Sequence, residues 1–166
     1  MTKRVAQNIG RPRAHRSAFT LVEVAVSVVI VGLLLATSVQ VVGAAKIGQY
    51  RLTERARGNA LAKALLAEIL QLAYADPNTE AGETRATFDD VDDYDGLNES
   101  PPVFKDGTAM TVPQASTWQR TVAVTWIDPL TLATTGSESG AKKIVVTVRH
   151  SGRSVATQTA IRTSAP

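Results

Sequence analysis

The residue with the clearest chemical potential is Glu23, because its carboxylate lies alone in a long apolar run. From Phe19 to Ala45 it is the only ionisable side chain. A carboxylate at bilayer depth costs roughly 3 kcal/mol on insertion scales, so such residues usually have a function. Two interpretations follow: Glu23 acts in assembly with another chain, or its side chain extends back to the lipid headgroups, one turn away.

A second group that could do chemistry is an acidic cluster of five carboxylates within seven residues. Its members are Asp89, Asp90, Asp92, Asp93 and Asp95. Carboxylate oxygens suit Ca²⁺, but the spacing does not fit an EF-hand: with Gly96 at the turn position, the ligand positions would fall on Val91 and Pro102. The alternatives are a metal site at these five aspartates, or a solvated loop whose aspartates cap helices and turns.

The sequence offers little for catalysis, so we expect no enzyme and no cofactor apart from the Ca²⁺ alternative. It contains no cysteine, and the only histidine after the N-terminal segment is His150, which we expect at an exposed sheet edge. Phosphate loops, zinc-ligand spacings and nucleophile elbows are absent from the sequence. Trp118 and Trp126 are expected in a small core or at its rim.

The net charge of +3 does not indicate nucleic-acid binding. Five of the 18 basic residues and none of the 15 acidic residues precede Phe19, which leaves 13 basic against 15 acidic residues in the rest. The basic character therefore belongs to the N-terminal segment, and we expect no nucleic-acid partner.

The elements that position these residues begin with a leader and a membrane helix. Residues 1–18 are basic and contain Gly10 and Pro12, which is typical of a flexible segment on the cytoplasmic side. Residues 19–45 would span about 40 Å as a helix, more than the roughly 30 Å of a hydrocarbon core. The sequence therefore predicts a transmembrane half-helix over 19–45.

The helical pattern continues over residues 46–75 with an amphipathic character. Half of its circumference is apolar, formed by Leu61, Ala62, Leu65, Leu66, Ile69, Leu70, Leu72 and Ala73. Pro77 disfavours helical geometry at the preceding residue, so we expect the helix to end near Ala75.

The remaining residues, 76–166, are predicted to form a head made of a loop and a β-sheet. A polar connection over 76–117 precedes β-branched runs at 120–126, 143–149 and 154–162, with a turn at 151–153. Antiparallel pairing of these runs would cover the apolar face of the helix. The expected fold class is α+β, a long N-terminal helix packed on a small antiparallel sheet.

The junction Ala18-Phe19-Thr20-Leu21-Val22-Glu23, followed by an apolar helix, resembles the leader junction of type IV pilins and type II secretion pseudopilins. The resemblance implies cleavage by a prepilin peptidase between Ala18 and Phe19 and N-methylation of the Phe19 amine. The residue before the cut is usually glycine, and Ala18 is similarly small. The resemblance therefore also implies a bacterial inner-membrane protein, with its N-terminus in the cytoplasm and its head in the periplasm.

The resemblance also implies the partners and the role of Glu23. The partners are other pilin or pseudopilin subunits, the prepilin peptidase and the inner membrane. Glu23 would neutralise the free amine of a neighbouring Phe19 during assembly. Gln40 stands where major pilins often have a helix-bending proline, which favours a minor subunit of a pseudopilus or a type IV pilus.

Two other classes of protein remain open from the residues. A secreted binding protein would have its signal peptide cut after Ala44 or Ala45, where small residues lie. A single-pass adhesin would keep the membrane helix and never polymerise. The position of the mature N-terminus distinguishes these classes from the pilin pathway.

Overall fold

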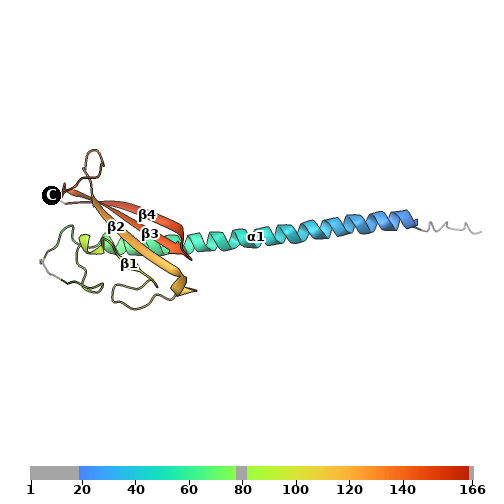
Figure 1. Ribbon diagram of the computed structural model, residues 1–166, viewed down its shortest axis with the longest axis horizontal. Coiled ribbons are helices and arrows are strands. Elements are labelled where there is room, and N and C mark those ends of the chain that lie inside the picture. The colour runs from blue at the N-terminus through green and yellow to red at the C-terminus, as the bar shows by residue number, and fades with distance from the viewer. Residues whose placement is uncertain (1–18, 78–81, 165–166) are drawn as a thin grey trace, which may run out of the picture. The chain divides into compact units, whose positions relative to one another are not determined.

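The structure is a computed structural model that describes residues 19–77 and 82–164, and it divides into two compact units. The N-terminal unit is Met1–Lys46 and the C-terminal unit is Ile47–Pro166. In chain order the elements are α1 (Leu21–Ile69), η1 (Asp92–Tyr94), β1 (Asn98–Glu99), η2 (Ala115–Thr117), β2 (Trp118–Trp126), β3 (Ala141–His150) and β4 (Arg153–Thr163). The α+β prediction is confirmed: a long N-terminal helix packs on a four-stranded antiparallel sheet (Figure 1).

Helix α1 ends at Ile69, six residues before the predicted end at Ala75. The N–H groups of Gln71 and Leu72 bond to carbonyls three residues back, which tightens the last turn. Ala73 then donates to Asp89 O and accepts from Val91 N. The helix ends early because the backbone turns out to form this bridge, an interaction with a distant segment that local propensity does not show.

The sheet has the strand order β1-β2-β3-β4, and every pair is antiparallel. The three predicted β-branched runs are confirmed as β2, β3 and β4, each slightly longer than expected. Ser151 and Gly152 connect β3 to β4 with positive φ angles of 49° and 78°, the conformation of a two-residue hairpin turn. The two-residue strand β1 lies in the connection that the sequence predicted to be irregular.

The core lies between the sheet and the part of α1 in the C-terminal unit. Alternate side chains of the strands and the predicted apolar face of the helix meet there. The buried helix residues are Gly58, Leu61, Ala62, Leu65, Leu66 and Ile69. Trp118 is buried and Trp126 is 38% exposed, so the prediction for the two tryptophans is confirmed.

Candidate functional site

The first turn of α1 holds Glu23 in a defined position. Thr20 precedes the helix, and its Oγ1 accepts the backbone N–H of Glu23 at 3.3 Å, which satisfies one donor at the helix N-terminus. The acidic side chain in the first turn also complements the positive end of the helix dipole. Thr20 and Glu23 have the spacing of a capping box, so this local sequence itself explains where the helix begins.

The N-terminal unit exposes its apolar side chains. All the described residues up to Lys46 are exposed, including Phe19 at 78%. The most apolar 18-residue window of α1 has a mean hydropathy of 2.4, and none of it is buried. By length and composition this helix can cross a membrane. Its apolar surface requires lipid or other helices, because water would solvate it poorly.

The hydroxyl groups within the apolar segment are satisfied inside the helix. Ser27 donates to the carbonyl of Glu23 at 2.7 Å, Ser38 donates to Leu34 O at 2.7 Å, and Thr37 bonds in the same way. Such bonds remove the need for water at these positions, which is what a hydrocarbon environment demands.

Glu23 is exposed, and no side chain among the described residues forms an ion pair with it. Its carboxylate is therefore available to a group on another molecule. Ala18 and the leader lie outside the described residues, so the structure gives no geometry for the predicted cleavage point. Cleavage, methylation and the assembly role remain predictions.

A chain of ion pairs, which the sequence analysis missed, crosses the C-terminal unit. Arg85 pairs with Glu68 of α1 (Nη1 to Oε1, 2.5 Å) and with Glu99 of β1 (Nε to Oε1, 2.7 Å). Arg120 of β2 has no exposed surface and donates from Nε to Glu99 Oε2 at 2.9 Å. Tyr94 donates to Glu68 and accepts from Arg85. The two cations and two anions balance, so no charge is buried alone.

The pKa of Glu68 reflects this network. Burial alone would raise its pKa, but the hydrogen bonds from Arg85 and Tyr94 and the charge of Arg85 outweigh burial and lower it. The ionised form is thus the one that the folded protein stabilises.

Lys142 of β3 is the second buried cation. Its Nζ donates to Asp92 Oδ2 at 2.6 Å and to the Tyr74 carbonyl, and it lies 4.2 Å from the Tyr74 ring centroid. Tyr74 in turn donates to Glu138. Burial and this hydrogen bond raise the pKa of Tyr74. These contacts join β3 to the segment after the helix and to η1.

A signal for both buried cations exists in the sequence. Arg120 is in phase with the buried Trp118 and Val122 along β2, and Lys142 is in phase with the buried Ile144 along β3. A charge on the apolar phase of a strand implies a buried partner. The carboxylates that pair with these two cations lie in distant segments, and the sequence pattern around them does not identify them as partners.

The carboxylates of the acidic cluster bind several different groups of the fold. Asp93 accepts the N–H groups of Asp89 and Asp90, Asp90 accepts the N–H of Asp93, and Asp92 pairs with Lys142. Asp95 accepts the N–H of Val124 at 2.8 Å. Four of the five carboxylates therefore cap turns or bind other elements, as the second of the two sequence interpretations describes.

In the described part of the chain, a different acid group lies closely packed: oxygens of Asp76, Glu83 and Asp89 are within 4.8 Å of one another. Burial, a hydrogen bond with Asp93 and the charges around it raise the pKa of Glu83 to about 7. Only Asp89 belongs to both groups. Ca²⁺ binding by the five aspartates stays a prediction.

His150 does not occupy the exposed edge that we expected. It ends β3, which lies between β2 and β4, and it stacks on Trp118 with ring centroids 4.4 Å apart. Its Nδ1 is 3.2 Å from Glu54 Oε1. The expectation was wrong because the flanking strand proved to be central.

Comparison with known proteins yields one match. Residues 13–39 match the family described as the prokaryotic N-terminal methylation motif. No curated protein sequence and no solved structure was found to match the chain. The matched segment contains the Ala18–Phe19 junction, Glu23 and the first part of α1.

The match supports the type IV pilin and pseudopilin family, and the α+β arrangement is pilin-like. The motif indicates a structural protein rather than an enzyme. With the exposed apolar helix, it fits a membrane-anchored protein that is cleaved by prepilin peptidase and methylated. In general terms it also suggests interaction with other pilin subunits.

Proposed function

We propose that this chain is a structural subunit, and specifically a minor one, of a type II secretion pseudopilus or a type IV pilus. The observation that carries the proposal is the coincidence of two features on α1. The methylation motif begins a helix whose N-terminal part exposes a mostly apolar surface, and the same helix continues into a folded unit. A subunit that moves from membrane to filament needs both.

Processing comes first. Prepilin peptidase cleaves between Ala18 and Phe19 on the cytoplasmic side of the inner membrane, and the new Phe19 amine is methylated. This step removes the five basic residues of the leader and leaves an amine one helical turn from Glu23.

Assembly then pairs Glu23 with the Phe19 amine of a neighbouring subunit. A carboxylate and an ammonium group are each unfavourable in lipid, and a charge-assisted hydrogen bond between them relieves both penalties. The exposed position of Glu23 and its lack of an ion pair in the described residues support this role. Filament growth would withdraw the helix from the bilayer into a bundle of like helices, with the C-terminal unit in the periplasm.

The preference for a minor subunit rests on α1. The helix runs from Leu21 to Ile69 without proline, with Gln40 at the position where a bend is common in major pilins. A filament shaft built from many such subunits would therefore lack the helix bend that is common in major pilins.

Substitution of Glu23 tests the assembly role. Glu23→Gln keeps the size of the side chain and removes the charge, so it should leave a methylated Phe19 N-terminus in mass spectra yet reduce incorporation into sheared filaments at least tenfold. Glu23→Asp, which keeps the charge, is the matched control and should retain part of the incorporation. Equal incorporation of the Gln variant and the wild type would refute the charge pairing.

A further inference from the structure

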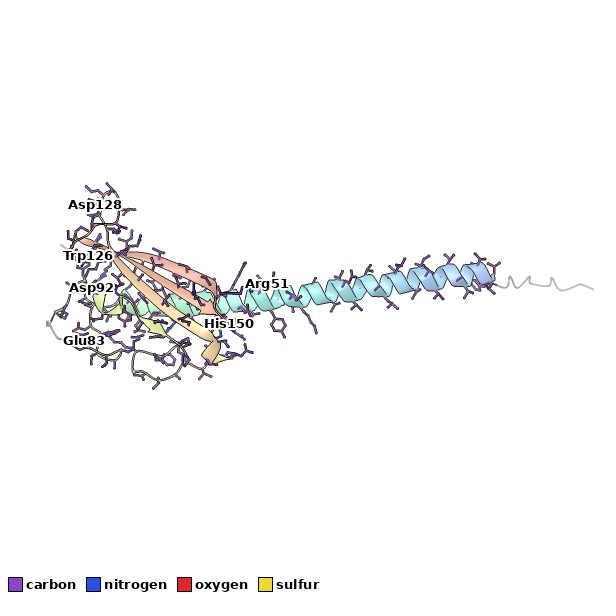
Figure 2. The ribbon with its side chains drawn as sticks, in the orientation of Figure 1. Arg51, Glu83, Asp92, Trp126, Asp128 and His150 are labelled. Carbon is purple, nitrogen blue, oxygen red and sulfur yellow. The ribbon has the colours of Figure 1, made fainter. Side chains whose placement is uncertain are left out.

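A basic hollow lies where the β3–β4 hairpin meets α1 in the C-terminal unit. Its volume is about 190 Å³. Arg51, Glu54 and Arg55 of α1 line one side, and His150, Arg153 and Ser154 line the other. Arg51 and His150 lie at the same end of this unit, far from Glu83 and Asp92 (Figure 2).

The charges of the hollow are not balanced within the described part of the chain. Its single carboxylate, Glu54, already pairs with His150. Among the described residues, Arg51, Arg55 and Arg153 make no ion pair and no side-chain hydrogen bond. This contrasts with the half-buried Arg85 and the buried Arg120 and Lys142, which are all paired. Three guanidinium groups thus remain available to an anion from outside.

The hollow is rigidly built. His150 is held between the Trp118 ring and the Glu54 carboxylate, which fixes the end of the hairpin against the helix. The N–H of Ser151 donates to the Thr117 carbonyl at 2.8 Å. The arginines therefore extend from elements whose separation is fixed. Binding of an anion then requires little additional ordering of the backbone, which lowers the entropic cost of binding.

In the sequence, two arginines of this hollow follow closely after the apolar segment. The apolar run ends at Ala45, and Arg51 and Arg55 follow within the next three turns of the same α-helix. Tyr50, which is 73% exposed, lies next to Arg51. Tyrosine and basic residues are typical of the zone where a membrane helix meets the lipid headgroups.

We propose that this hollow binds the phosphate groups of anionic phospholipids in the leaflet next to the C-terminal unit. Guanidinium groups bind phosphate with paired N–H donors, and basic residues near an anionic surface each contribute about 1 kcal/mol, or about fivefold in affinity. The inference rests on membrane anchoring but not on polymerisation. The contact would hold the subunit at a set depth until filament growth withdraws it from the lipid.

Native mass spectrometry of the full chain in mild detergent, titrated with phosphatidylglycerol or phosphatidylcholine, tests the proposal. At about fivefold for each of the three arginines, the wild type should retain phosphatidylglycerol over phosphatidylcholine on the order of a hundredfold. Arg153→Gln alone should lower this preference about fivefold, and Arg51→Gln/Arg55→Gln/Arg153→Gln should bring it close to parity. Circular dichroism checks that the variants fold.

The matched control removes three positive charges elsewhere in the C-terminal unit: Lys63→Gln/Lys105→Gln/Lys143→Gln. It should keep the preference. An unchanged preference in the arginine triple variant, or an equal loss in the lysine control, would overturn the proposal. If the arginine triple variant keeps its lipid preference but no longer cross-links to a second copy of the chain, the hollow is a contact between subunits. That result would also overturn the proposal. Failure of the pilin assignment would appear separately, as a mature N-terminus other than Phe19.

Discussion

Gly58 is the position where the sheet approaches α1 most closely among the glycines of the described residues. A Cβ added there would lie 2.7 Å from Val155 Cγ2 and 3.3 Å from Ala156 Cβ on β4. Gly48, on the same helix, has no atom within 4 Å of such a Cβ. Alanine substitution at the two positions therefore separates a packing effect from a backbone effect.

The expected magnitudes follow from two terms. Replacing glycine by alanine in a helix stabilises it by about 1 kcal/mol at either position. At Gly58 overpacking opposes this gain, at a cost of about 1–3 kcal/mol, because Val155 and Ala156 must move. We therefore expect Gly48→Ala to raise the free energy of unfolding by about 1 kcal/mol, and Gly58→Ala to fall below that control by about 1–3 kcal/mol.

Thermal unfolding of the full chain in mild detergent measures this difference. Near-ultraviolet circular dichroism of the buried Trp118 reports on the C-terminal unit. At about 4 °C per kcal/mol, the two variants should differ in Tm by about 4–12 °C. Equal shifts for both variants would refute the close packing of α1 on β4.

Two further predictions concern the buried ion pairs. Arg120→Met should lower the free energy of unfolding by about 3–5 kcal/mol, because Glu99 keeps its buried charge and loses one of its two cations; a loss below about 1 kcal/mol, measured by urea unfolding, would contradict this. Because the folded state lowers the pKa of Glu68, its contribution to stability should be present above the unfolded pKa near pH 4.5 and disappear as the pH falls through the folded value. Glu68→Gln should therefore reduce the fall of Tm at acid pH. If Tm falls with pH as steeply in this variant as in the wild type, the Glu68 carboxylate is not responsible for the acid dependence.

The sequence predicted the elements whose signal is local. The β-branched runs of β2, β3 and β4 and the apolar face of α1 each follow from their own residue pattern. The turn at Ser151 and Gly152 was likewise visible, since glycine favours positive φ.

Elements that depend on distant partners could not be predicted in this way. The two residues of β1 are a strand only because Asn98 and Glu99 pair with Thr121 and Arg120. The end of α1 at Ile69 likewise depends on a bridge to residues about twenty positions later. Neither of these long-range contacts can be inferred from the local secondary-structure propensity of the residues.

The candidate functional residues also include some that the sequence alone reveals and others that only the fold brings together. The junction at Ala18 and Phe19 is a contiguous motif, so the sequence alone revealed it. The basic hollow joins residues from α1 and the β3–β4 hairpin, which only the fold brings together. The individual roles of the clustered aspartates also required the positions of Lys142 and Val124.

The most direct test of the proposed function is mass spectrometry of the mature N-terminus, from cells with and without prepilin peptidase. The proposal predicts a peptide that begins at methylated Phe19 and is absent without the peptidase. A start near Ala45 or Lys46 would instead indicate a secreted protein. An uncut N-terminus in both strains would indicate an anchored protein outside the pilin pathway.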